Sequence, residues 1–160
     1  MDPMDFRSIR IASIAGSSTL NLSAASQLVA KYSWGEDYPV VPFEEINHAD
    51  FCVGAWKRKT LVGFAAVTRN GSPDGNGNGE LWLGYAVVVP ELRRRGIFRR
   101  LYAACVTRLQ TFPGRVFSCT DNPIIAAFLL RHGWQFERET HDESGESCLV
   151  FEYPRVSQVN

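Results

Sequence analysis

The sequence lacks the features of a membrane, secreted or metal-binding protein. It has no apolar run long enough to cross a bilayer, and residues 1–5 do not carry the basic start and apolar stretch of a secretion signal. Its four cysteines form no Cys-x-x-Cys pair and its three histidines are isolated. We therefore expect a cytoplasmic protein with buried, reduced thiols, no metal and no membrane partner.

An overall charge is also missing. The 17 basic and 17 acidic residues give a net charge of zero, which argues against nucleic acid as the main partner. The length of 160 residues suits one domain, over residues 1–160, with a sizeable core. What basicity exists is local, in five arginines within eight positions: Arg93, Arg94, Arg95, Arg99 and Arg100.

Periodicity and turn residues predict an alternation of strands and helices. Strands are expected at 8–14, 51–56, 60–68, 80–89, 116–120, 135–140 and 147–153. Helices are expected at 20–32 and 95–111, and from Pro123, after a cap at Asp121 or Asn122, to a stop at Gly133. Residues 35–50 look irregular, and the Gly- and Asn-rich segment 69–79 is expected to be a mobile, turn-forming loop. This order predicts the α/β class, a mixed sheet with helices on both faces.

The turn after the strand at 80–89 has the form of a phosphate-binding site. Pro90 ends the strand, and Gly96 lies just before the apolar stripe of a helix. The first N–H groups of a helix lack internal partners, and the helix dipole adds about half a positive charge there. Gly96 would let a pyrophosphate approach closely, and the arginines would add charge-assisted contacts. Taken alone, the pattern also fits an ordinary solvated helix start.

Two motifs in the right order strengthen this interpretation. Arg93-Arg94-Arg95-Gly96-Ile97-Phe98 follows Val88-Val89-Pro90, and Asn122, a helix and Gly133-Trp134 follow a strand. In these motifs the sequence resembles the GNAT superfamily of acetyl-CoA-dependent N-acetyltransferases, over about residues 51–153. The resemblance implies a mostly antiparallel sheet of six or seven strands, whose central strands splay apart to admit the cofactor.

The resemblance also implies roles for particular residues. Acetyl-CoA would be the acyl donor, and its acetyl group would pass directly to a primary amine in a ternary complex. Backbone groups of Ala86, Val87 and Val88 would pair with the pantetheine arm, and Asn122 would lie near the pantetheine or thioester end. The pyrophosphate would lie on the turn and the helix start, at Arg93, Arg94, Arg95, Gly96, Ile97, Phe98 and Arg99. Members of the family are often dimers, so a homodimer is possible.

Two positions depart from the family pattern. Phe98 replaces a small residue, and its place on the apolar stripe favours core packing as the explanation. Leu129 stands where many relatives have a tyrosine that protonates the departing thiolate; Tyr85, Ser118 and Tyr102 are alternative donors. Without that tyrosine, the alternative function is an acyl-CoA-binding sensor or regulatory module with little catalytic activity.

A general base near the amine would assist transfer. Glu80, at the start of the strand at 80–89, is the main candidate, although an ordinary exposed carboxylate at a loop end is an equal alternative. Weaker candidates are Glu44, Glu45, His48 and Asp50.

The acceptor itself is left open between a small-molecule and a peptide amine. The acidic stretch 36–50 would attract a cationic amine, or it is simply a solvated loop. Trp34, Trp56 and Trp82 either line an acceptor pocket or pack in the core.

Overall fold

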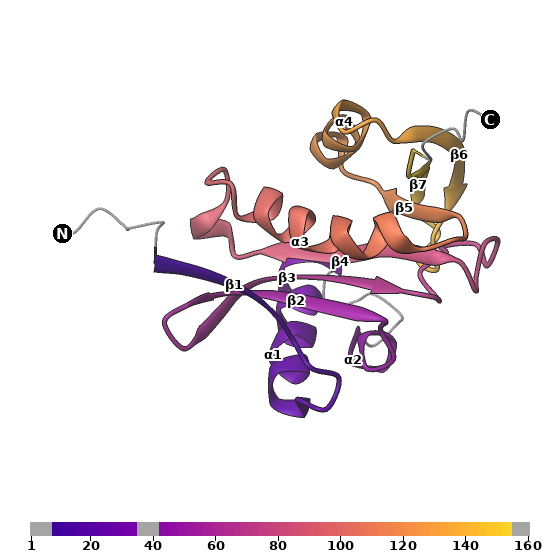
Figure 1. Ribbon diagram of the computed structural model, residues 1–160. Helices are drawn as coiled ribbons and strands as arrows, with labels where there is room; N and C mark the ends of the chain where they lie inside the picture. The colour runs from indigo at the N-terminus through magenta and orange to yellow at the C-terminus, as the bar shows by residue number, and fades with distance from the viewer. Residues whose placement is uncertain (1–7, 35–41, 155–160) are drawn as a thin grey trace.

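A seven-stranded sheet forms the middle layer of the protein, in the order β1-β2-β3-β4-β5-β7-β6 (Figure 1). The structure, a computed structural model, describes residues 8–34 and 42–154. The strands are β1 (Ile9–Ser13), β2 (Phe51–Lys57), β3 (Thr60–Thr68), β4 (Leu81–Val88), β5 (Val116–Thr120), β6 (Gln135–His141) and β7 (Ser147–Glu152). Neighbouring strands are antiparallel except β4 and β5, which are parallel and joined through a helix.

Helices cover both faces of the sheet (Figure 1). They are α1 (Thr19–Val29), α2 (Pro42–Ile46), α3 (Ile97–Thr111) and α4 (Pro123–Arg131). On one face, α3 and α4 share a core that contains Leu101, Phe128 and Trp134. On the other face, α1 and α2 cover a second core that contains Leu22, Ile46 and Phe64. The predicted class, a mixed and mostly antiparallel sheet with helices on both faces, is confirmed.

Most element boundaries agree with the sequence predictions. Asn122 is the cap of α4, since its Oδ1 accepts the Ile124 N–H at 2.9 Å, and Gly133 follows the helix with a φ of 87°. The region expected to be irregular contains α2, and α1 continues into a π-helical turn, Ala30–Trp34. The four cysteines are unpaired in the described residues; Cys52, Cys105 and Cys148 are buried, as expected, whereas Cys119 is partly exposed.

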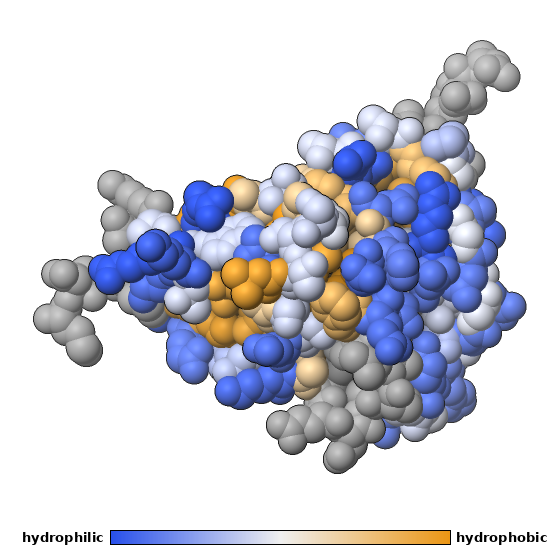
Figure 2. All heavy atoms as spheres, turned by 90° about the horizontal axis from the view of Figure 1, so that it is seen from below, coloured by the Kyte–Doolittle hydropathy of each residue, from blue (hydrophilic) through white to orange (hydrophobic). Residues whose placement is uncertain are grey.

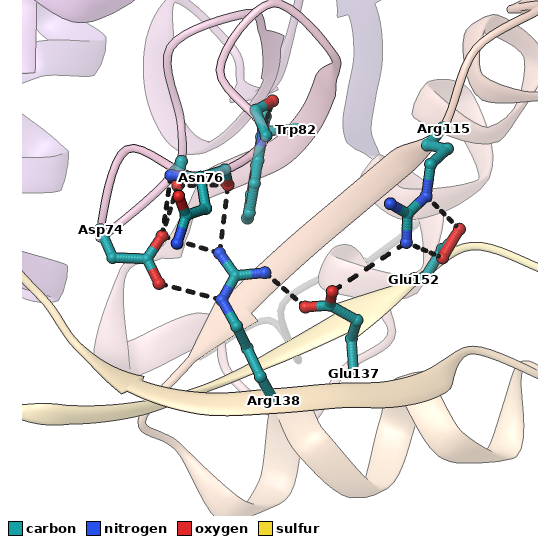
Figure 3. Close-up of polar contacts among 9 residues, drawn as sticks. Asp74, Asn76, Trp82, Arg115, Glu137, Arg138 and Glu152 are labelled. Atoms are coloured by element: carbon teal, nitrogen blue, oxygen red, sulfur yellow. Dashed lines mark hydrogen bonds and ion pairs between the residues drawn. The ribbon is translucent and has the colours of Figure 1, made fainter.

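The loop at 69–79 differs from the prediction of a mobile segment, because side chains of the loop and of β6 hold it in place (Figure 3). The Ser72 hydroxyl donates to Asn76 O at 2.8 Å, and the indole N–H of Trp82 donates to Gly77 O at 2.9 Å. Arg138 of β6 donates hydrogen bonds to both carboxylate oxygens of Asp74, at 2.9 and 2.7 Å. Hydrogen bonds therefore tie the loop to β4 and β6.

Candidate active site

A bulge in β4 sets the geometry of the site. Phe64 of β3 lies opposite Val87, but Ala66 lies opposite Gly84, so two residues of β4, Tyr85 and Ala86, face one residue of β3. Tyr85 takes up the extra residue with a φ of 58°. Such a bulge bends a strand and redirects side chains. Tyr85 consequently packs on the α1 and α2 face instead of alternating toward α3.

Immediately at this bulge, β4 and β5 separate. Their pairing ends at Leu83 with Ser118, where the Ser118 hydroxyl donates to Leu83 O at 2.8 Å. From Gly84 onward, β3 is the only strand in the described part of the chain that pairs with β4. A Cβ built on Gly84 would meet no atom within 4 Å. The predicted splay is thus confirmed, and space is open where it begins.

One carbonyl on the unpaired edge of β4 already accepts a hydrogen bond from within the protein. The Val89 N–H donates to Val62 O of β3 at 2.9 Å, so the carbonyl of the same trans peptide, Val88 O, points toward the opposite edge. There it accepts a hydrogen bond from Arg93 Nε at 2.9 Å, and Arg93 Nη2 donates to Tyr32 O at 3.3 Å. Arg93 therefore ties the turn to β4 and to the π-helical turn that follows α1.

The turn between β4 and α3 leaves backbone donors exposed. The first α3 bond to a residue before the helix is the Arg100 N–H donating to Gly96 O at 3.1 Å. Across residues 8–34 and 42–154 we find no acceptor for the N–H groups of Gly96, Ile97, Phe98 and Arg99. Gly96 has a φ of 82° and open space where a Cβ would lie. This helix start has the geometry and the partial charge to bind an anion.

All five arginines are exposed, and two of them also bond to backbone carbonyls of other elements. Arg93 and Arg100 serve the fold, since Arg100 Nη2 donates to Ile9 O at 2.9 Å. The other three, Arg94, Arg95 and Arg99, are exposed around the helix start. Phe98 is partly buried, with its ring 4.9 Å from that of Phe128 in an edge-to-face contact. Core packing accounts for this bulky residue, while its N–H remains on the turn.

Asn122 lies at the opposite side of the splay, at the start of α4. Besides its cap bond, its N–H donates to the Thr120 hydroxyl at 3.0 Å. It lines a pocket of about 310 Å³ together with residues of β5, α4 and β7, among them Thr120, Ala126 and Leu149. The side-chain carbonyl is engaged in the cap, so a ligand contact there would use the amide nitrogen or share that oxygen.

Of the candidate proton donors, Tyr85 is the one whose hydroxyl bonds to a carboxylate. Leu129 is 1% exposed in the core and has no hydroxyl. The Tyr102 hydroxyl is buried and accepts the Trp134 indole N–H at 2.8 Å, and the Ser118 hydroxyl holds β4 to β5. The Tyr85 hydroxyl, in contrast, reaches α2 and donates to Glu45 Oε2 at 3.0 Å.

The surroundings of Tyr85 are acidic. Burial raises the pKa of Tyr85 well above its ordinary value, and the negative charges of Glu45 and Glu143 raise this pKa further. The phenol is therefore protonated at neutral pH and acts as a hydrogen-bond donor. Figure 2 shows the α1 and α2 side of the molecule, where a group of hydrophobic residues is surrounded by hydrophilic ones.

The remaining candidate bases form no hydrogen bond with Tyr85 in the described part of the chain. Glu80 lies before β4, where its carboxylate accepts the Arg115 N–H at 2.9 Å. At about 3.3 Å per strand residue, it is roughly 13 Å from Gly84. Glu44 and His48 are exposed, and Asp50 pairs with Arg69 at 3.1 Å.

The tryptophans of the described region are core residues. Trp56 and Trp82 are both buried. The other members of the predicted acceptor region, Glu36, Asp37 and the side chain of Trp34, lie outside the described residues.

Three features of the site were not anticipated from the sequence. Tyr85 and Glu45 were named separately, but nothing local in the sequence indicated that residues 40 positions apart would be hydrogen-bonded. The hydrogen bond from Arg93 to Val88 O and the open space at Gly84 were likewise not predicted. A strand position with glycine beside a tyrosine is a signal for a bulge that could have been used.

Within the described ranges, every helix is too short or too polar to traverse a lipid bilayer. The same residues contain no cluster of three or more His, Cys, Asp or Glu side chains suited to a metal ion. The cytoplasmic location and the homodimer stay predictions.

A splayed parallel pair of strands that leads into an anion-binding helix start is the architecture of an acyl-CoA-dependent N-acyltransferase. The family profile of the acetyltransferase (GNAT) family matches residues 20–134, and the chain belongs to this family. Its members use acyl-CoA as the acyl donor.

Solved structures with the same fold agree. An acyl-CoA N-acyltransferase from Pseudomonas aeruginosa superposes with a TM-score of 0.71 at 16% identity, covering 92% of this chain and 100% of that one. The ribosomal-protein-S18-alanine N-acetyltransferase of Escherichia coli gives a TM-score of 0.69 at 15% identity, with 95% and 98% covered. An aminoglycoside 6'-N-acetyltransferase complexed with coenzyme A gives 0.67 at 15%, with 91% and 98% covered. No curated protein matches the sequence.

Proposed function

We propose that the protein transfers an acetyl group from acetyl-CoA to a cationic primary amine, by direct attack in a ternary complex. The observation that carries this proposal is the pairing of two features at one point of the sheet. An unpaired edge of β4 leads into the open start of α3, and Tyr85, at the bulge of the same strand, is hydrogen-bonded to Glu45 of α2.

For the acyl donor, the proposal assigns the splayed edge and the helix start. The pantetheine arm would lie along Ala86, Val87 and Val88, with Arg93 closing its far end at Val88 O. The pyrophosphate would accept hydrogen bonds from the N–H groups of residues 94–99, and Arg94, Arg95 and Arg99 would supply charge. Acetyl-CoA, when bound, supplies the activated acyl carbon and a thiolate leaving group.

For the acceptor, the acidic side of the splay supports a positively charged amine. Glu45 would hold the ammonium and take the proton that it must lose before attack. Tyr85 would orient this carboxylate, because its phenol is a permanent donor. Glu80 remains an alternative base, but its bond to the Arg115 N–H and its distance from Gly84 favour Glu45.

The alternative function, a module that binds acyl-CoA without efficient transfer, also has an observation in its favour. Leu129 is buried, so the tyrosine that many relatives use as a proton donor has no direct replacement on α4. Transfer would then depend on water to protonate the leaving thiolate.

One experiment separates the two functions. We would measure acetyl-CoA binding by calorimetry, and thiol release with a panel of polyamines, aminoglycosides, amino acids and peptides with a free N-terminus or lysine. The proposal expects binding, together with release that depends on a cationic amine. Binding without release on any amine would establish the sensor function. Failure to bind acetyl-CoA would overturn both.

A further inference from the structure

Three asparagines of the loop at 69–79 are each followed by a glycine. They are Asn70, Asn76 and Asn78, and all three are exposed. Asparagine is among the residues that heat and time alter chemically. In an Asn-Gly pair the glycine nitrogen can attack the asparagine side chain, because glycine has no Cβ to shield its nitrogen and lets the backbone turn. The loop thus contains the same reactive dipeptide three times, in three different surroundings.

Two conditions decide whether this attack can occur in a folded chain. The asparagine side chain must be able to turn back onto the main chain, and the N–H of the glycine must be able to lose its proton. Hydrogen bonds to either group, or to the backbone between them, hold these atoms in place and oppose the reaction. The hydrogen bonds of the loop therefore rank the three sites.

Asn78 is held most firmly of the three. Its Oδ1 accepts the Ser72 N–H at 3.3 Å, and its own N–H donates to Gly75 O at 3.4 Å. The N–H of the following residue, Gly79, donates to Arg69 O at 2.9 Å. Neither condition is met at this site.

Asn76 is held through its main chain. Its N–H donates to Asp74 Oδ1 at 3.0 Å. Its carbonyl accepts hydrogen bonds from the Ser72 hydroxyl at 2.8 Å and from Arg138 Nη2 at 3.1 Å. No described residue forms a hydrogen bond with its side-chain amide or with the Gly77 N–H. The reacting groups are available at Asn76, but the backbone cannot turn freely to bring them together.

Asn70 has neither kind of restraint. Across the ranges that the structure covers, 8–34 and 42–154, its side chain and main chain form no hydrogen bond, and the Gly71 N–H has no acceptor. The bonds that hold the loop lie on either side of this pair, at Arg69 and at Ser72. Both conditions are therefore met at Asn70.

We propose that Asn70 is the site at which this loop deamidates. The Gly71 nitrogen loses its proton to solvent base and attacks Cγ of Asn70. The bond from Cγ to the side-chain nitrogen breaks, and this nitrogen takes up a proton and leaves as ammonia. Water then opens the cyclic imide at either of its carbonyls, which gives aspartate or isoaspartate. In total, one water is consumed and one ammonia is released, without an oxidant or a cofactor.

The products alter the base of the loop. Each adds a negative charge directly after Arg69, whose guanidinium pairs with Asp50 at 3.1 Å. Isoaspartate also routes the main chain through its β-carbon, so that the backbone gains one atom. Arg69 O accepts the Gly79 N–H and so closes the loop. We therefore expect isoaspartate at position 70 to loosen the loop.

The test incubates the folded protein at mildly alkaline pH and maps its peptides by mass spectrometry over time. Conversion of an amide into an acid locates each deamidated asparagine, and methyl transfer by a protein L-isoaspartate methyltransferase identifies isoaspartate. We expect Asn70 to convert about 10-fold faster than Asn78, because two hydrogen bonds must open at Asn78. Asn76 should be intermediate. In guanidinium chloride, which removes these hydrogen bonds, the three rates should become similar.

Two matched variants check the assignment. Asn70→Gln keeps a side-chain amide but would have to close a larger ring, so the early product should disappear. Asn76→Gln should leave the early product unchanged. Equal rates at the three sites of the folded protein, or faster conversion at Asn76 or Asn78 than at Asn70, would overturn the proposal.

Discussion

The two halves of β4 differ in almost every respect. The first half, Leu81 to Leu83, pairs with β5, and Trp82 at its centre stacks on Phe117 with ring centroids 4.9 Å apart. The second half, from Gly84 to Val88, has a bulge, one strand partner and an edge of exposed backbone. One continuous strand thus carries a fixed segment and an open segment, and Ser118 marks the boundary between them.

This contrast shows how the fold positions a site that consists largely of backbone groups. Every residue except proline keeps the main-chain N–H, so the placement of these donors depends more on the backbone of the neighbouring segment than on side-chain identity. That support comes from the paired first half of β4, from the loop at 69–79, and from the hydrogen bonds between Arg138 and Asp74. Changes in the open half should therefore alter function, whereas changes in the fixed half should alter stability.

The largest effect is expected from filling the open space at the splay. The Gly84→Leu side chain would project into the space where a Cβ meets no atom within 4 Å. We expect a folded protein in which amine-dependent thiol release is abolished, as measured with acetyl-CoA and the best amine of the panel. Gly16→Leu is a matched control, since Gly16 also has open space around its Cβ but is far along the chain from the splay. Full activity in Gly84→Leu would mean that the acyl group enters elsewhere.

The next effect concerns the acidic pair at the bulge. Glu45→Gln keeps the size of the side chain and an acceptor oxygen for Tyr85 but removes the base, so kcat should fall about 100-fold. Glu44→Gln removes an exposed carboxylate from the same helix and should leave kcat unchanged. CoA affinity, measured by calorimetry, should be equal in both variants. If Glu45→Gln and Glu44→Gln behaved alike, Glu80 would become the preferred base.

A smaller effect is expected at the helix start. Gly96→Ala and Gly75→Ala both place an alanine at a positive φ, 82° and 84°, with open space around the new Cβ. Each should lower the free energy of unfolding by about 1–2 kcal/mol, as measured by denaturant titration. Only Gly96→Ala should also weaken CoA binding, by about 10-fold, because its methyl group disturbs a charge-assisted hydrogen bond to phosphate. Equal CoA affinities would place the pyrophosphate away from this turn.

The sequence was informative wherever a local signal decides the structure. Pro90, Gly96 and Asn122 each act on the backbone within a few residues, so the end of β4 and the starts of α3 and α4 were predictable. Contacts between distant residues were not, because no periodicity links Tyr85 to Glu45. The loop at 69–79 shows the same limit. Its glycines and asparagines favour turns, but its order comes from Arg138, 64 residues beyond Asp74.

The smallest predicted effect concerns the Arg138–Asp74 ion pair, and it is confined to stability. Arg138 lowers the pKa of Asp74 well below its ordinary value, chiefly through their hydrogen bonds, and the two side chains are 23% and 18% exposed. Asp74→Asn should therefore lower the free energy of unfolding by about 1–2 kcal/mol at pH 7. A lowered pKa contributes stability above the unfolded value of about 3.9 and loses it as the pH falls toward the folded value. The difference between wild type and Asp74→Asn should accordingly shrink below about pH 4.

Asp50→Asn is the control, because it breaks a more exposed pair with Arg69 and should lower the free energy of unfolding by at most about 1 kcal/mol. Equal losses in the two variants would mean that the loop is held by its own turns, and that the fixed half of β4 does not depend on β6.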